Sequence, residues 1–359
     1  MRYVSDSTFL RHDRGKRTAC AISPRMPRRR SGMEVMMRNG VLNVYKEAGF
    51  TSHDVVAKLR GICGQKKIGH TGTLDPDAVG VLPVCLGNAT KLCDLLAGET
   101  KEYEAVLLLG KTTDTQDLSG TVLAEQEVTV DEREAEEAVL SFLGAYEQIP
   151  PMYSALKVNG KKLYELARAG KEVERRPRPV QIFSLRILKT ELPEITFRVE
   201  CSKGTYIRTL CQDIGERLGC GGAMKSLKRT RVGVFGAEEA RTLAELEQLA
   251  KENRLEEALI PVETLFSRCP RLMVKPEFER LVKNGNELHP DQVVMDQVDM
   301  VQAVPERTEG CAAEKISGMA GPGPENFRVC GPDGTFYGLY AFSGTKENGT
   351  YRPVKMFLT

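Results

Sequence analysis

The chain has 359 residues, of which 41% are hydrophobic and 28% charged, values typical of a globular protein of about two domains. Its net charge is +2, and the lack of an apolar run near the roughly 18 residues of a membrane helix argues against a membrane span. Ten cysteines occur without a Cys-x-x-Cys pair, and only four histidines are present. We therefore expect reduced thiols in a cytoplasmic protein, with no disulfide framework and no metal site.

The N-terminal 40 residues carry ten Arg or Lys and three Asp or Glu, a net charge of +7 that leaves −5 for the rest. Residues 1–32 lack apolar periodicity, and we expect a disordered basic extension at 1–36. It can be a transit-like leader, a basic RNA-contacting tail, or the product of a start assigned upstream of Met33, Met36 or Met37. The first apolar pattern begins at Val41, which favours the last interpretation.

Apolar spacing predicts the elements of the body in chain order. A strand at 41–45 precedes a helix that Thr51 and Ser52 can cap. There follow an apolar stretch at 79–86, a short helix at 89–96, a strand at 103–109, a polar loop at 112–120 and a helix at 131–143. We then expect strands at 180–188 and 195–201, a helix from 204 to 218, a Gly-rich link at 219–222 that leads through basic residues to an apolar run at 232–235, and a helix at 243–259. After about residue 266, short strand-like runs predict a small β-rich domain.

The loop Gly69–Pro76 gathers an acid, an imidazole and two hydroxyls within eight residues. Two glycines flank His70 and Thr71, so the backbone can turn tightly and approach a ligand closely. Asp75 precedes a proline, which disfavours helix and favours an extended or turn conformation. Spacing alone favours a structural Asx-turn at Asp75 over a catalytic role.

Residues 150–180 form a basic segment with interleaved tyrosines. A solvated charged loop and a nucleic-acid surface explain this composition equally well, because cations meet phosphates and aromatic rings stack on bases.

Five stretches, in order, resemble the bacterial tRNA pseudouridine synthases that modify position 55 in the T arm. They are GHTGTLDPDAVGVLPVCLGNATK from Gly69, KEYEAVLLLGKTTDTQD from Lys101, PPMYSALKVNGKKLYELAR from Pro150, GTYIRTL from Gly204 and LKRTRVGVF from Leu227. The resemblance implies an α+β pseudouridine synthase fold, with a central mixed sheet in a catalytic domain at 37–265 and a thumb insertion at about 148–180. GPDGTFYGLYAF and VKMFL resemble the family's C-terminal RNA-binding module of the PUA type, expected at 266–359.

The resemblance implies that a uracil is detached from C1′ of its ribose, turned, and rejoined through C5. This reaction needs no metal, nucleotide or redox cofactor, and the implied partner is tRNA, bound by a monomer without membrane contact. Asp75 is implied as the catalytic aspartate, either a nucleophile at C1′ or a base at C2′. Burial would raise the pKa of Asp75 and neutralise it, whereas an adjacent arginine would oppose this, and Arg208 resembles the family's ion-pair partner.

The remaining site residues are also assigned by resemblance. Tyr103 resembles a ring that stacks on the target uracil, Tyr206 and Leu227 resemble walls of the base pocket, and His70 resembles a residue that places the flipped nucleotide. Lys46 resembles the lysine of a Lys-Pro pair, although position 47 is Glu here. The side chains expected to hold backbone phosphates while the base is extruded are Lys157, Lys161, Lys162 and Arg229.

Two other functions compete with this one. An RNA-binding folding helper that has lost chemistry is disfavoured by the intact Asp75, Tyr103 and Arg208. A guide-RNA-dependent relative of the same superfamily is disfavoured by the bacterial-type thumb segment and by the absence of a long Lys-rich C-terminal tail.

Overall fold

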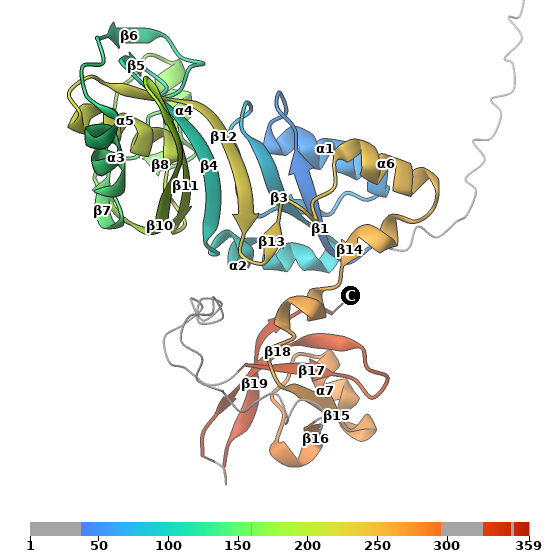
Figure 1. Cartoon of the computed structure of the whole chain (residues 1–359). Helices are drawn as coiled ribbons and strands as arrows, with labels where there is room; N and C mark the ends of the chain where they lie inside the picture. The colour runs from blue at the N-terminus through green and yellow to red at the C-terminus, as the bar shows by residue number, and fades with distance from the viewer. Residues whose placement is uncertain (1–36, 159, 296–325, 346–347, 359) are drawn as a thin grey trace, which may run out of the picture. The chain divides into compact units, whose positions relative to one another are not determined.

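The computed structural model describes residues 37–158, 160–295, 326–345 and 348–358 (Figure 1). The expected basic extension at 1–36 lies outside the described residues. The strands of the larger sheet are β1 (Gly40–Lys46), β2 (Ile68–His70), β3 (Val79–Leu86), β4 (Lys101–Leu109), β7 (Gly144–Gln148), β10 (Arg178–Glu191), β11 (Glu194–Cys201), β12 (Gly222–Val232), β13 (Phe235–Gly236) and β14 (Leu259–Ile260). Their order is β14-β1-β3-β12-β4-β11-β10-β7, with β2 beside β3 and β13 beside β12. The pairing of β3 with β12 is parallel and the other pairings are antiparallel.

Within the described residues, five helices pack on this sheet, and three of them begin at a capping residue that the sequence supplies. Their bounds are α1 (Ser52–Cys63), α2 (Cys93–Ala97), α3 (Glu132–Leu140), α5 (Ile207–Arg217) and α6 (Leu243–Lys251), with single 3₁₀ turns at η1 (Gly87–Leu92), η2 (Leu255–Ala258) and η3 (Val262–Phe266). Thr51, Asp131 and Thr242 each form a capping box with an acid three residues later. Such a box satisfies backbone N–H groups that the first helical turn leaves free.

Apolar clusters pack the helices against the two ends of the sheet. α1 and α6 lie at one end of the sheet and α3 and α5 at the other (Figure 1). At the first end, Leu42 and Leu82 of the sheet pack with Leu59 of α1 and Leu246 of α6. At the other, strands β4, β10 and β11 bury their side chains against α3 and α5. The eight cysteines in the described part of the chain are free thiols, and six of them are buried.

The C-terminal part of the chain forms a separate five-stranded sheet. Its order is β16-β15-β17-β18-β19, and the elements are β15 (Arg271–Val274), η4 (Pro276–Phe278), α7 (Glu279–Lys283), η5 (Pro290–Gln292), β16 (Val293–Met295), β17 (Asn326–Cys330), β18 (Phe336–Ser343) and β19 (Thr350–Met356). Leu272, Val282 and Tyr340 are fully buried in its own apolar cluster. The expected β-rich C-terminal region is confirmed.

The largest departure from the expected elements is β12, which lies in the stretch interpreted as a link with basic residues. This strand pairs with both β3 and β4 and is central to the sheet. Register shifts between Met224 and Ser226 and between Arg229 and Arg231 interrupt its alternation. A bulge moves the following side chains to the other face. The usual period of two is therefore absent from the sequence of β12.

Two short hairpins interrupt segments that the sequence leaves irregular. β5 (Lys111–Thr113) pairs with β6 (Val122–Glu125), so part of the expected polar loop is a strand. In the expected thumb, β8 (Lys157–Val158) pairs with β9 (Lys161–Lys162), and α4 (Leu163–Arg168) follows directly. The thumb leaves the sheet after Gln148 of β7 and returns at Arg178 of β10, which pair with each other.

Candidate active site

The loop Gly69–Pro76 leaves β2 and is tied down along its length. The Thr71 N–H donates to the carbonyl of Pro83 at 3.2 Å, and the Leu74 N–H donates to the hydroxyl of Ser52 at 2.9 Å. The side chain of Leu74 is buried in the larger apolar cluster. Because both ends of the loop are held, Asp75 has a fixed position over the sheet.

Arg208 is the partner of Asp75. Nε of Arg208 lies 3.0 Å from Oδ2 of Asp75, and Nη2 lies 3.4 Å from Oδ1. The side chain of Arg208 is 6% exposed, whereas that of Asp75 is 38% exposed. The arginine therefore supports the carboxylate from inside while the carboxylate keeps an open side.

Three further acceptors hold the guanidinium of Arg208. Nη1 donates to the carbonyl of Thr115 at 2.9 Å, and Nη2 donates to the carbonyl of Tyr153 at 2.8 Å. Oδ2 of Asp117 lies 3.7 Å from Nη1. Asp117 was absent from the expected site, although it lies in the KEYEAVLLLGKTTDTQD motif. The sequence signal that could have identified Asp117 is an acid close to two hydroxyl residues in this polar loop.

Burial raises the pKa of Asp75, and the charge of Arg208 opposes that rise. The negative charge of Asp117 raises it further. Burial prevails, because taking a carboxylate out of water disfavours its ionised form. The site therefore holds an acid whose ionisation depends on the balance among Asp75, Arg208 and Asp117.

Tyr103 of β4 and Leu227 of β12 share an apolar cluster with Leu74, the residue before Asp75. The side chain of Tyr103 is 8% exposed. Burial raises the pKa of the Tyr103 hydroxyl, so it is neutral at ordinary pH. Tyr206 is half-buried at the N-cap of α5, two residues before Arg208. Three site residues were assigned by resemblance. Tyr103 and Leu227 lie in the cluster that buries Leu74, beside Asp75 in sequence, and Tyr206 begins the helix that carries Arg208.

His70 lies at the end of β2 with its ring half-buried. Nδ1 of His70 accepts the Gly72 N–H at 3.3 Å, and the ring meets His53 edge to face with centroids 5.4 Å apart. Burial lowers the pKa of His70, and the neighbouring His53 and Arg229 lower it further. The neutral ring is favoured, and with Nδ1 accepting, we assign the proton to Nε2.

Two residues expected to bind substrate are instead internal supports of the loop. Arg229 was expected to hold phosphates, but its side chain is buried, and its Nε, Nη1 and Nη2 donate to the carbonyls of Val81, Thr73 and Gly72. Lys46 is also fully buried, and its Nζ donates to the carbonyl of Pro76 at 2.8 Å. Burial lowers the pKa of Lys46 to about 8. The cationic groups of both side chains are thus engaged with backbone carbonyls of the protein.

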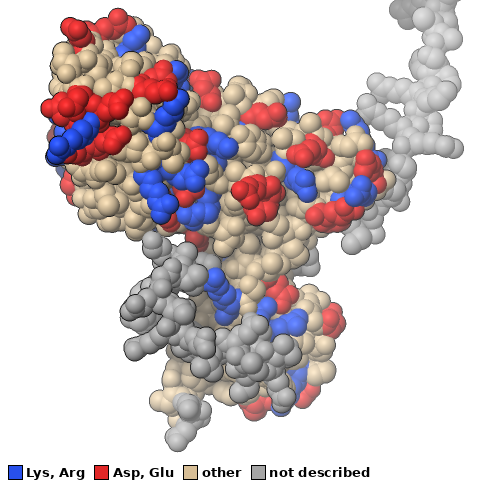
Figure 2. Space-filling view, in the orientation of Figure 1, with Lys and Arg blue, Asp and Glu red and all other residues tan. Residues whose placement is uncertain are grey.

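The thumb lysines remain accessible. Lys157 and Lys161 are exposed on the β8–β9 hairpin, and Lys162 is half-buried with Nζ 3.2 Å from the hydroxyl of Tyr164. Figure 2 shows basic and acidic side chains interspersed on the visible face. On this face, an anionic partner would be held by local groups of cations rather than by a uniformly positive surface.

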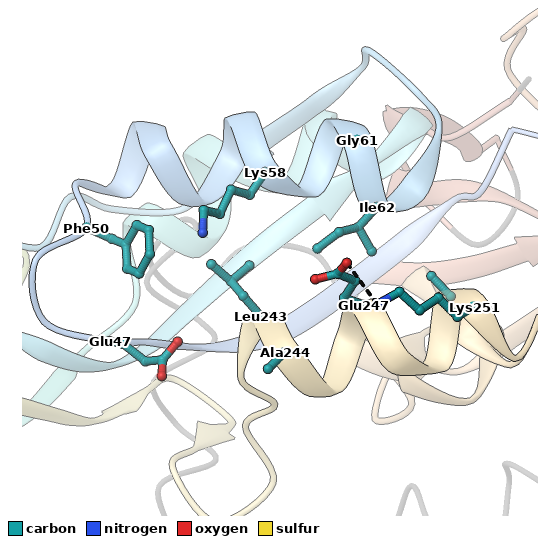
Figure 3. A pocket seen from close by; sticks show the side chains of 10 residues that line it. Glu47, Phe50, Lys58, Gly61, Ile62, Leu243, Ala244, Glu247 and Lys251 are labelled. Atoms are coloured by element: carbon teal, nitrogen blue, oxygen red, sulfur yellow. Dashed lines mark ion pairs between the residues drawn. The ribbon is translucent and has the colours of Figure 1, made fainter.

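A groove of about 670 Å³ lies elsewhere, between α1 and α6 (Figure 3). Apolar side chains such as Phe50, Ile62 and Leu243 line it, and Glu247 and Lys251 form an ion pair at its edge. It contains none of the expected site residues. Among the described residues, we find neither a cluster of three or more His, Cys, Asp or Glu suited to a metal nor a helix long and apolar enough to cross a membrane.

Solved structures define the class of this fold. A structure described as "Crystal Structure of a Cbf5-Nop10-Gar1 Complex" matches with a TM-score of 0.62 and 26% identity, covering 89% of this chain and 85% of that chain. A structure described as "Structure of H/ACA RNP bound to a substrate RNA containing 2'-deoxyuridine" matches with a TM-score of 0.62 and 24% identity over the same shares. The expected pseudouridine synthase fold is confirmed.

Sequence comparison narrows the class to a family. A model described as "TruB family pseudouridylate synthase (N terminal domain)" matches residues 60–207, and one described as "tRNA pseudouridylate synthase B C-terminal domain" matches 208–267. The chain is 52% identical to the tRNA pseudouridine synthase B of Lachnoclostridium phytofermentans, over 89% of this chain and 100% of that protein. The corresponding protein of Clostridium tetani is 44% identical over 81% of this chain and 98% of its own length. The chain belongs to the TruB family of pseudouridylate synthases, which confirms the resemblance.

The border between the two family models is not a border in the fold. It falls at the first turn of α5, and β12 of the second model lies between β3 and β4 of the first. The Asp75–Arg208 pair itself joins the two matched regions.

Proposed function

We propose that this chain converts uridine 55 in the T arm of tRNA to pseudouridine, with Asp75 as the catalytic residue. Support comes from relatives named tRNA pseudouridine synthase B at 44–52% identity. The observation that carries the site assignment is the ion pair between Asp75 and the buried Arg208, at 3.0 Å. The charge of Arg208 favours the ionised form of this acid and opposes the effect of burial.

The reaction is an isomerisation that balances without a co-reactant. The C1′–N1 bond breaks, the uracil turns, a C1′–C5 bond forms, the proton leaves C5 and N1 gains a proton. The ionised Asp75 acts in one of two ways, as a nucleophile at C1′ or as a base at C2′. Either role requires a carboxylate with an open side, and the 38% exposure of the Asp75 side chain meets this requirement.

The groups around Asp75 have roles that suit a base flipped out of the stack. Extrusion costs a few kcal/mol, and stacking on an aromatic ring returns about 1–3 kcal/mol. Tyr103 supplies that ring, Leu227 and Tyr206 bound the pocket, and neutral His70 places the nucleotide through Nε2–H. Lys157, Lys161 and Lys162 of the thumb bind backbone phosphates without reading sequence.

The catalytic domain spans 37–265, its thumb about 148–180, and a PUA-like RNA-binding domain 266–359. Asp75, Arg208, Asp117 and Tyr103 come from one chain, so one copy holds the whole site and we infer a monomer. The eight free thiols among the described residues suit the reducing cytoplasm.

Loss of the C5 proton provides the test. The protein is incubated with an unmodified tRNA transcript labelled with tritium at C5 of uridine, and released tritium is counted. One equivalent of release per tRNA, with pseudouridine mapped to position 55, is the expected result. Release from another position would contradict the T-arm assignment, and no release from any tRNA would contradict the activity.

A further inference from the structure

We propose that Gln148 is a positioning residue that holds Tyr206, and through it the start of α5, in a fixed position relative to the neck of the thumb. The neck is the point where Gln148 of β7 pairs with Arg178 of β10. This inference rests on the proposed function and adds to it a residue that does not touch the substrate. Gln148 is absent from the expected site.

The side chain of Gln148 binds the backbone of Tyr206 on both sides. Oε1 of Gln148 accepts the Tyr206 N–H at 2.8 Å, and Nε2 donates to the Tyr206 carbonyl at 3.0 Å. Nε2 also donates to the hydroxyl of Tyr146. A primary amide thereby supplies the donor and acceptor that a neighbouring strand would offer. Only an amide or a protonated acid presents both groups in this geometry.

The two hydrogen bonds from Gln148 to Tyr206, called the clamp below, act where α5 has no side-chain cap of its own. Tyr206 is the N-cap of α5, and its own side chain caps no backbone N–H. Arg208 lies two residues further on, in the first turn of the helix. Gln148 is 1% exposed, so water cannot replace its hydrogen bonds. A backbone N–H that loses its partner away from water is left unsatisfied at a cost in free energy.

Gln148 also closes the neck of the thumb. Its backbone pairs with Arg178, so the thumb departs and returns at this point of the sheet. Five residues beyond Gln148, the carbonyl of Tyr153 accepts a hydrogen bond from Nη2 of Arg208. The base of the thumb therefore contacts the start of α5 at two points: the Gln148 side chain binds Tyr206, and the Tyr153 carbonyl binds Arg208. A shift at the neck would move both the pocket wall at Tyr206 and the guanidinium that holds Asp75.

The test uses the full-length protein with three variants and a single-turnover assay on tritiated tRNA. Gln148→Met keeps the length of the side chain and loses both bonds, so we expect the rate to fall by about tenfold or more. The Kd for tRNA should stay within about twofold, because Gln148 faces the core. Tyr146→Phe is the matched control, since it removes the third contact of the amide and leaves both bonds to Tyr206. Its rate should remain within about twofold of wild type.

Gln148→Glu separates positioning from packing. A protonated glutamic acid can both accept and donate, whereas its carboxylate can only accept. Burial raises the pKa of a carboxyl group, so the neutral form persists into the assay range. The rate of this variant relative to wild type should therefore be near one at low pH and fall as pH rises. A purely structural lesion would lower the relative rate equally at every pH.

Hydrogen exchange at the Tyr206 amide, followed by mass spectrometry, gives a reading independent of turnover. Exchange should quicken in Gln148→Met and not in Tyr146→Phe. Unchanged exchange, a wild-type rate in Gln148→Met, or equal rate losses in Gln148→Met and Tyr146→Phe would each overturn the proposal. If wild-type protein releases no tritium, the proposed function fails, and exchange still decides whether the clamp exists.

Discussion

Asp75 and Arg208 form a two-contact ion pair, Nε to Oδ2 at 3.0 Å and Nη2 to Oδ1 at 3.4 Å, across 133 residues of sequence. The pair is asymmetric. The carbonyls of Thr115 and Tyr153 and the carboxylate of Asp117 also hold the guanidinium, whereas the carboxylate of Asp75 has an open side. These contacts hold Arg208 in place, so a reacting atom must approach Asp75 from its open side.

The first prediction concerns the carboxylate itself. Asp75→Asn keeps the shape of the side chain and removes its charge, so pseudouridine formation should fall at least about 1000-fold. Binding of tRNA, measured by filter retention, should persist. Asp77→Asn is the control, because Asp77 is an exposed acid two residues away and its variant should turn over within about twofold of wild type. Turnover retained in Asp75→Asn would refute the assignment.

The second prediction concerns pH. The active form of Asp75 is ionised and its pKa is raised, so activity is lost as pH falls through a value above the ordinary one of about 3.9. The charge of Asp117 contributes to that rise. Asp117→Asn should therefore lower the pKa of Asp75 and move the acid limb of kcat/KM to lower pH. An acid limb that stays in place, or moves to higher pH, would contradict this account.

The third prediction concerns the thumb. Replacing Lys161 and Lys162 together by Ala should weaken tRNA binding and reduce the slope of log Kd against log salt by up to about 1.8, since each lost phosphate contact removes about 0.7–0.9. The measurement is a salt titration of tRNA binding. Lys58 and Lys251, beside the groove between α1 and α6, provide the control double variant, which should leave the slope unchanged. An unchanged slope in the thumb variant would mean that these lysines do not meet phosphates.

The fourth prediction distinguishes a support from a phosphate ligand. Arg229→Met leaves the carbonyls of Val81, Gly72 and Thr73 without their buried donor and should reduce the free energy of unfolding by about 3 kcal/mol or more. Urea denaturation measures the loss. Lys228→Met, at the exposed neighbouring position, should change stability by less than about 0.5 kcal/mol. For both variants, the slope of log Kd for tRNA against log salt should equal that of the wild-type protein.

Local chemistry in the sequence predicts much of the fold and the central loop. The helix start at Thr51 and the strand that carries Tyr103 follow from capping and alternation, which act within a few residues. The non-helical conformation at Asp75 follows from Pro76, which disfavours helix at the residue before it. Family resemblance then paired Asp75 with Arg208, which spacing alone does not.

Tertiary structure decided which charged side chains face the core. Lys46 and Arg229 are basic residues like Lys161, yet the fold buries the first two beneath the Gly69–Pro76 loop and exposes the third on a hairpin. It also made a central strand of β12, whose bulges hide the usual alternation, and it brought Asp117 and Gln148 to Arg208 and Tyr206. Local patterns arise from neighbours in sequence, whereas burial and long-range hydrogen bonds depend on strand order. The sequence by itself therefore determined the acid and the turn that carries it, and only the packed sheet determined what holds that acid in place.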